Sequence, residues 1–265
     1  MILRSPGAIL FHYGFITIRW YGIMIALGFL LALQVAKRIA SKSGLNQEDL
    51  VSTLFFSFLG GIIGARLYYV AISLSYFSHH VNEILAVWKG GMSIHGGVIG
   101  GLIFGGYYCY KKKLPLWQYL DVAGVILPLG QGIGRWGNFF NQEAFGTPVS
   151  DSFPLKLYIE PAFRPLSYFA SAYFQPTFLY ESVWDILIFF ILLGLFFQTK
   201  LKSGSLFFIY LILYSYGRLL VEPIRTDSIT YNDFPIPIIA CYVTITVGLA
   251  FLIAMNKQFL AKLKK

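Results

Sequence analysis

Four polar side chains lie close together in an otherwise apolar part of the chain, and their types could do chemistry. The segment Gly134–Gly146 contains Arg135, Asn138, Asn141 and Glu143. Such groups are costly to remove from water unless they are paired or bind a ligand. We therefore interpret this segment as a functional site.

A second polar group occupies the end of a later apolar stretch. Tyr214, Arg218 and Glu222 follow one another at intervals of four residues, which would place them on one face of a helix. Pro223 disfavours helical geometry at Glu222, so Arg225 is expected in the turn after the helix. A purely structural ion pair between Arg218 and Glu222 is an open alternative to a functional role.

Three permanent cations, Arg66, Arg135 and Arg218, lie inside or at the edges of apolar stretches. Guanidinium groups carry forked donors that match phosphate oxygens, so their convergence on a cavity would favour a phosphate-bearing ligand. In a bilayer, the abundant ligand of that kind is a phospholipid. Arg66 could instead extend its charge to the interface as a structural anchor.

His95 lies in an apolar stretch, between glycines that leave space around its ring. The histidine has no obvious local partner. One alternative is a structural residue whose hydrogen bonds are made within the protein. The other is a group that transfers a proton or forms a hydrogen bond with a substrate.

The elements that must position these residues are membrane helices. Hydrophobic residues make up 57% of the 265 residues and charged residues 12%, and the mean hydropathy is +0.65. This composition is typical of an integral membrane protein. The net charge of +9 is expected to reflect membrane topology and some attraction to anionic headgroups, with no nucleic-acid partner.

Windows of about 19 residues predict seven transmembrane helices. We expect an all-α polytopic membrane protein that forms one transmembrane domain over residues 1–265. The predicted spans lie near 17–36, 52–73, 90–110, 116–135, 178–198, 205–222 and 236–255.

Basic residues predict the orientation of the spans. More than half of the 21 lysines and arginines follow the first, third, fifth and last spans. These residues are Lys37, Arg38, Lys42, Lys111, Lys112, Lys113, Lys200, Lys202, Lys257, Lys262, Lys264 and Lys265. The positive-inside rule then predicts an N-terminus outside and a C-terminus in the cytoplasm.

Two further features bear on the fold. The long connection 141–177, rich in proline and aromatic residues, is expected to form a small subdomain on the outer side, between the fourth and fifth spans.

Glycines four residues apart in the second and third spans, such as Gly60 with Gly64 and Gly96 with Gly100, predict close helix packing.

These motifs together resemble the bacterial prolipoprotein diacylglyceryl transferases. Gly134–Gly146 agrees with that family's pattern G-R-x-G-N-F-x-N-x-E-x-x-G at every fixed position. The other matching blocks, in the family's order, are Tyr21, Gly64–Arg66, His95–Gly97, Gln175–Glu181 and Tyr214–Arg225. Two departures are Pro223, where a bulky apolar residue is usual, and Gln-Pro-Thr at 175–177, where His-Pro-Ser is common.

The resemblance implies transfer of the sn-1,2-diacylglyceryl group of phosphatidylglycerol to the lipobox cysteine thiol of a prolipoprotein signal peptide. A thioether would form and glycerol 1-phosphate would leave. The partners would be the phospholipid, the signal peptide and the bilayer of the bacterial cytoplasmic membrane, and no cofactor or metal is implied.

The resemblance and the charges together imply roles for single residues. Arg135 is expected to bind the phosphate and Arg218 the same phosphate or the leaving group, while His95 is the first candidate for the base, with a structural or headgroup-binding role as its alternative. Supporting or substrate-binding roles fall to Tyr21, Arg66, Asn138, Asn141, Glu143, Tyr214, Glu222 and Arg225.

A competing interpretation is a non-catalytic anion channel or phospholipid-binding transporter. Buried arginines and helices packed through glycine would suit such a protein. A transporter often has matched interrupted segments in two halves, and this sequence shows no such symmetry.

Overall fold

A computed structural model describes residues 1–14, 16–87, 90–198, 201–228, 230–231 and 234–263. It is mostly helical and contains two compact units. The first unit is formed by Met1–Val35 and Leu120–Lys265, and the second by Ala36–Tyr119. That the whole chain works as one transmembrane domain stays a prediction.

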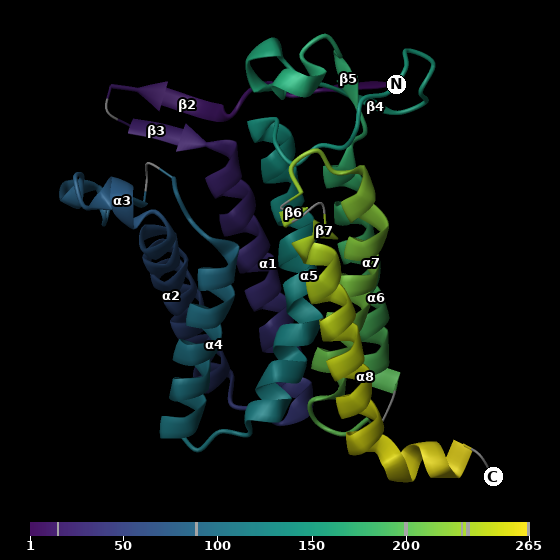
Figure 1. Cartoon of the computed structure of the whole chain (residues 1–265). Coiled ribbons are helices and arrows are strands. Elements are labelled where there is room, and N and C mark those ends of the chain that lie inside the picture. The colour runs from purple at the N-terminus through teal and green to yellow at the C-terminus, as the bar shows by residue number, and fades with distance from the viewer. Residues whose placement is uncertain (15, 88–89, 199–200, 229, 232–233, 264–265) are drawn as a thin grey trace. The chain divides into compact units, whose positions relative to one another are not determined.

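Each predicted span corresponds to one long helix among the described residues (Figure 1). These helices are α1 (Trp20–Ser43), α2 (Gln47–Ile72), α4 (Ile94–Lys111), α5 (Leu116–Asn141), α6 (Thr177–Gln198), α7 (Ser205–Val221) and α8 (Ile236–Leu263). A short helix, α3 (Leu74–Phe77), follows α2. By length and composition, α1, α2, α6, α7 and α8 are able to cross a membrane. The chain is therefore a polytopic membrane protein.

Several helix ends differ from the predicted spans. The first helix begins at Trp20 instead of residue 17 because strand β3 (Ile16–Arg19) pairs antiparallel with β2 (Ile9–Tyr13), and its Ile and Thr residues favour extended backbone. Helix α2 begins earlier than predicted, at Gln47, because the side chain of Asn46 accepts hydrogen bonds from the first-turn amides.

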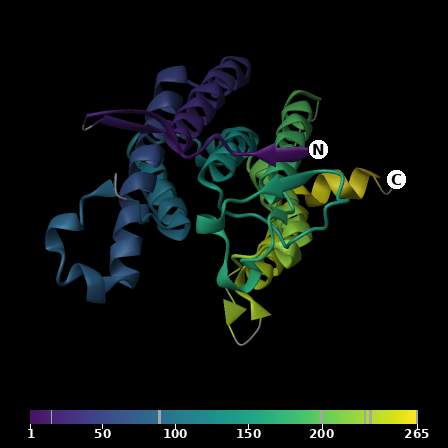
Figure 2. The ribbon, with the colours of Figure 1, turned by 90° about the horizontal axis from the view of Figure 1, so that it is seen from above.

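In the first unit, α5, α6 and α7 approach one another through small residues. The Ser182 hydroxyl of α6 donates to the carbonyl of Gly132 in α5 at 2.7 Å. A Cβ at Gly124 of α5 would lie 2.8 Å from Phe207 Cα in α7. These close contacts bring the polar faces of three helices together. Figure 2 views the same elements from above.

Short strands, which the sequence did not predict, lie at one end of α5–α7 (Figure 1). Strand β1 (Ile2–Arg4) pairs parallel with β4 (Lys156–Tyr158), which pairs antiparallel with β5 (Tyr173–Phe174). A further two-stranded pair, β6 (Thr230–Tyr231) and β7 (Phe234–Pro235), precedes α8. The connection 141–177 thus has structure of its own, and its location outside the membrane stays a prediction.

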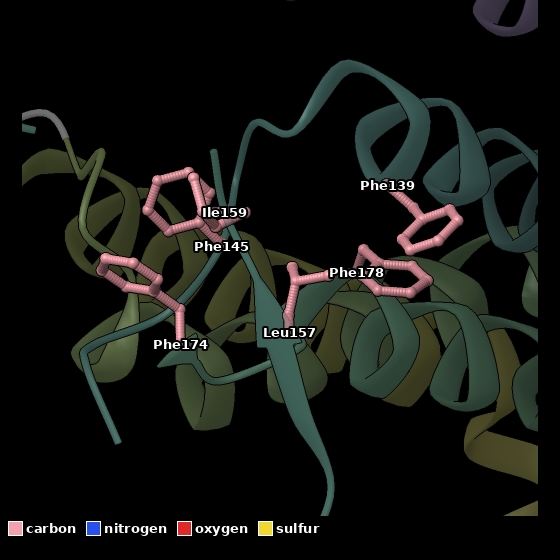
Figure 3. Close-up of a cluster of buried hydrophobic side chains, with 6 residues drawn as sticks. All are labelled: Phe139, Phe145, Leu157, Ile159, Phe174 and Phe178. Atoms are coloured by element: carbon pink, nitrogen blue, oxygen red, sulfur yellow. The ribbon is translucent and has the colours of Figure 1, made fainter. Parts of the chain in front are cut away.

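A buried aromatic cluster joins this connection to the helix ends. Phe139 of α5 and Phe178 of α6 have ring centroids 5.0 Å apart, and Phe145 lies 4.8 Å from Phe174 of β5. Leu157 and Ile159 complete the cluster (Figure 3). Burial of these side chains packs the Gly134–Gly146 segment, which contributes Phe139 and Phe145, against the connection and the start of α6.

In the second unit, α2 and α4 pack through their glycines, which confirms the predicted close contact. A Cβ at Gly60 would lie 2.5 Å from the Phe104 side chain, and a Cβ at Gly100 would overlap the Gly60 carbonyl oxygen. Backbone-to-backbone packing of this kind requires glycine at both positions.

Some basic residues used to predict the orientation lie outside the described residues, namely Lys200, Lys264 and Lys265. The orientation of the termini therefore stays a prediction.

Candidate functional site

Three arginines converge on one carboxylate in the first unit. Glu181 Oε1 lies 2.7 Å from Arg218 Nη1 and 3.1 Å from Arg135 Nη2, while its Oε2 lies 3.2 Å from Arg225 Nη1. Glu181 is 6% exposed. A buried carboxylate with three guanidinium partners offsets much of the mutual repulsion among the arginines.

Two further carboxylates complete the ion-pair cluster. Arg218 Nη2 lies 2.5 Å from Glu222 Oε2, and Arg225 forms a two-point contact with Asp227. Glu222 also accepts a hydrogen bond from the Ser228 hydroxyl at 2.6 Å. The predicted pair of Arg218 with Glu222 is therefore present.

The prediction that Arg225 lies beyond the helix is confirmed. Helix α7 ends at Val221, a single 3₁₀ turn covers Glu222–Ile224, and Arg225 has extended backbone angles. This turn points the guanidinium of Arg225 back to Glu181, a contact that a continuous helix would not make.

The C-terminal end of the Gly134–Gly146 segment forms backbone hydrogen bonds with two segments that are distant in the sequence. Gly146 N–H donates to the Gln175 carbonyl at 2.9 Å, and Thr147 N–H donates to the Ile224 carbonyl at 2.7 Å. A Cβ at Gly146 would lie 2.8 Å from Gln175 Cβ and 3.0 Å from the Ile224 oxygen. Glycine is thus needed here because three chain segments meet with no room for a side chain.

A cavity of about 290 Å³ adjoins the ion-pair cluster. Its polar wall consists of Arg135, Glu181, Asp185, Tyr214 and Arg218. Its apolar wall includes Trp184, Leu220, Val221 and Ile224. The lining therefore combines charged donors with hydrophobic side chains, as an amphipathic ligand requires.

The other polar residues of the segment bond with each other. Asn138 Nδ2 donates to Glu143 Oε1 at 2.9 Å, and Asn141 Nδ2 donates to the same oxygen at 3.4 Å. Glu143 thus orients two asparagines, and none of the arginine ion pairs above involves it. The ring of Tyr21 packs on Gly137, where a Cβ would lie 2.5 Å from the ring.

Arg66 and His95 belong to the second unit. Arg66 is 6% exposed and donates to the backbone carbonyls of Ile84 and Gly90, both at 2.7 Å. It also donates to the carbonyls of Gly91, at 2.9 Å, and Glu83. These bonds fold the loop that leads to α4 and favour the structural alternative for Arg66. Its contact with substrate stays a prediction.

His95 lies in the first turn of α4 and is exposed. The preceding turn is fixed by a hydrogen bond from Ser93 N–H to the Ala65 carbonyl at 3.0 Å. The neighbouring ring is that of Tyr68, with centroids 6.1 Å apart. An exposed imidazole of this kind is available to a substrate.

Sequence reasoning missed the two carboxylates of α6 that line the cavity. Glu181 was named as an acidic group available to the arginines and as the end of the Gln175–Glu181 block, but not as a residue of the site, and Asp185 was not singled out. The signal was present, because two acidic residues four apart in a helix as apolar as α6 share one buried face.

Comparisons with known proteins show the family of the chain. The family model for prolipoprotein diacylglyceryl transferase matches residues 8–254. A phosphatidylglycerol–prolipoprotein diacylglyceryl transferase of Acaryochloris marina is 43% identical over 249 residues, covering 94% of this chain and 90% of the relative. Proteins of the same name from Thermotoga maritima and Staphylococcus aureus are 40% and 45% identical, covering 94% and 86% of this chain and 85% and 81% of the relatives. With a match of this extent, the chain belongs to the prolipoprotein diacylglyceryl transferase family.

Proposed function

We propose that this chain transfers the sn-1,2-diacylglyceryl group of phosphatidylglycerol to the lipobox cysteine thiol of prolipoproteins at the cavity beside Arg135 and Arg218. The products are a thioether-linked lipoprotein precursor and glycerol 1-phosphate. Membership in the family supports the reaction, and the charges of the cavity support the location.

The observation that carries this assignment is the hydrogen-bonding capacity of Arg135. A guanidinium has five N–H donors, and the described residues engage Arg135 in one ion pair, with Glu181. Arg225, in contrast, contacts both Glu181 and Asp227, and Arg218 joins Glu181 to Glu222. Arg135 therefore has the most donors left for the phosphate of a ligand.

The chemistry requires a displacement at the glyceryl carbon. A C–S bond forms to the thiolate, which is the competent nucleophile. The C–O bond breaks, and its electron pair remains on the phosphate oxygen. Arg135 and Arg218 would stabilise the charge that develops on the leaving phosphate, because preorganised donors are strongest where water is excluded.

The thiol proton requires an acceptor, and His95 is the residue we assign to it. Its imidazole is exposed and follows a turn whose Ser93 N–H donates to the Ala65 carbonyl. The alternative role for His95 is a contact with the headgroup, and the kinetic test below distinguishes the two.

Supporting residues fall into two groups. Asn138, Asn141 and Glu143 form a hydrogen-bonded set one helical turn after Arg135 and would contact the glycerol hydroxyls or orient the phosphate-binding arginine. Substrate contacts of Tyr21, Arg66, Tyr214, Glu222 and Arg225 are part of the same proposal. Glu222 and Arg225 would in addition hold Arg218 and Glu181 in place through their ion pairs.

The proposed topology has seven spans in the bacterial cytoplasmic membrane, with α4 and α5 also crossing it. The N-terminus and the connection 141–177 would lie outside and the C-terminus in the cytoplasm. Single cysteines at Ser150 and at Lys112, placed in a chain without Cys109 and Cys241, test this with a thiol reagent that does not cross membranes. Labelling of Ser150→Cys but not Lys112→Cys in intact cells is expected, and the reverse pattern would refute the orientation.

The function is tested with purified protein in detergent, phosphatidylglycerol labelled in its diacylglyceryl group, and a lipobox peptide. Wild-type protein should form labelled thioether, and Arg135→Ala should lose it. Arg38→Ala, which removes an exposed arginine that does not line the cavity, serves as the matched control. His95→Asn should reduce kcat if His95 is the base, and should mainly raise KM if it contacts the headgroup.

The competing candidate is a phospholipid-binding transporter or anion channel, because a cavity lined by two arginines would also bind lipid anions. Binding of phosphatidylglycerol by well-folded wild-type protein without any thioether would favour that function and exclude the transferase.

A further inference from the structure

One carboxylate of the cavity takes no part in the ion-pair cluster. Asp185 lies on α6 one helical turn after Glu181, is 2% exposed and lines the same cavity. Its Oδ2 atom is buried and has no hydrogen-bond partner among the described residues. Buried carboxylate oxygens are nearly always hydrogen-bonded, because their removal from water is costly. Asp185 therefore has an acceptor that a ligand can satisfy.

The arginines do not supply the missing donor. Their ion pairs go to Glu181, Glu222 and Asp227. The polar wall of the cavity thus has two parts with opposite chemistry. Arg135 and Arg218 present donors, which suit phosphate oxygens, and Asp185 presents an acceptor, which suits a hydroxyl or an ammonium group.

The charges of the wall favour a hydroxyl over an ammonium group. An ammonium bound to Asp185 would share a small cavity with the guanidinium groups of Arg135 and Arg218, and like charges at short range repel strongly where water is excluded. A hydroxyl donates one hydrogen bond without adding positive charge.

We propose that Asp185 accepts a hydrogen bond from a glycerol hydroxyl of the phospholipid headgroup and so makes the cavity selective for a polyol headgroup. This assignment rests on the proposed function, because it requires the donor phosphate to lie beside Arg135 and Arg218. Asp185 would be a specificity-determining residue, and transfer itself would not require it.

Two phospholipid donors separate this role from a structural one. Phosphatidylglycerol has two headgroup hydroxyls, and phosphatidylpropanol has the same phosphodiester and a headgroup without them. For wild-type protein, kcat/KM should favour phosphatidylglycerol by about tenfold, the value of one hydrogen bond to a charged group. Leucine has a similar size and no acceptor. Asp185→Leu should therefore bring the ratio of kcat/KM for phosphatidylglycerol to kcat/KM for phosphatidylpropanol close to one, mainly through a higher KM for phosphatidylglycerol.

Two other variants serve as controls. Asp185→Asn keeps one acceptor oxygen and should retain part of the preference. Ser182→Ala removes a buried hydrogen bond from the same helix, to Gly132 outside the cavity wall, and should leave the ratio of the two donors unchanged. Equal losses of kcat/KM for both donors in Asp185→Leu, with an unchanged ratio, would overturn the proposal.

Wild-type protein provides a measurement that does not depend on the folding of any variant. Glycerol 1-phosphate should inhibit transfer more strongly than n-propyl phosphate, which has the same phosphate and no hydroxyl, again by about tenfold. Equal inhibition by the two compounds would refute the role of Asp185. Absence of any transfer from phosphatidylglycerol would instead refute the proposed function, so the two failures are distinct.

Discussion

Arg218 of α7 and Glu181 of α6 form the shortest of the three ion pairs that Glu181 makes, with 2.7 Å between Nη1 and Oε1. The two residues are far apart in the sequence and meet because α6 and α7 pack through Gly217, where a Cβ would overlap the Trp184 ring. Glu181 thereby becomes the common counter-ion of Arg135, Arg218 and Arg225.

Glu181→Gln should therefore destabilise the protein and reduce transfer. The change leaves three mostly buried cations without their shared counter-ion, and breaking a buried ion pair typically costs about 3 to 5 kcal/mol. Thermal unfolding in detergent measures the loss, and transfer from phosphatidylglycerol measures the effect on the site. Asp227→Asn is the control, because Asp227 is about half exposed and its loss should cost under about 1 kcal/mol. Wild-type stability of Glu181→Gln would show that Glu181 is not the common counter-ion.

A glycine pair on α4 tests the packing of the second unit. Gly100→Ala should lower the unfolding temperature, because its Cβ would overlap the Gly60 carbonyl, whereas a Cβ at Gly106 meets nothing within 4 Å. Gly106→Ala should be neutral or stabilising by up to about 1 kcal/mol, since alanine loses less backbone entropy on folding. Equal behaviour of the two variants in thermal unfolding would contradict the close packing of α2 and α4.

The start of α7 depends on a side chain from another helix. The residue before the helix is Gly204, with a φ of 95°, and it has no side chain to cap the first turn. Asp121 of α5 accepts hydrogen bonds from Gly204 N–H at 2.6 Å and Phe207 N–H at 3.1 Å. Asp121→Ala should cost about 1 to 2 kcal/mol of stability, with a smaller loss for Asp121→Asn. Transfer per folded molecule should stay close to wild type, and a selective loss of transfer would point to a role in the reaction.

Arg66→Lys tests whether Arg66 is structural or binds substrate. A lysine cannot reproduce the forked contacts with four backbone carbonyls, so the variant should lose about 2 kcal/mol of stability. If the role is structural, KM for phosphatidylglycerol in the folded fraction should remain near wild type. A raised KM with unchanged unfolding temperature would instead support the contact with substrate.

The positions of the helices could be predicted from the sequence because runs of apolar residues have to avoid water. The helix ends could not be predicted, because they depend on contacts of single residues. Asn46 caps the start of α2, and α1 begins only at Trp20 because the preceding residues pair in the β2–β3 hairpin. The strands β1 and β4 were missed for a related reason. They are three residues long and pair across more than 150 positions, so no local pattern marks them.

The amino-acid sequence by itself determined that this is a membrane protein of the transferase family, because hydropathy and the spacing of motif residues are local properties of the chain. It also indicated Arg135 and Arg218 as cations in an apolar setting. Only the tertiary structure decided which charges neutralise one another. Glu181 pairs with three arginines, Glu143 accepts hydrogen bonds from two asparagines, and Oδ2 of Asp185 has no partner in the part of the chain that the structure describes. Such pairings depend on distances of a few ångströms between helices that are remote in the sequence, because the strength of an ion pair or hydrogen bond falls steeply with separation.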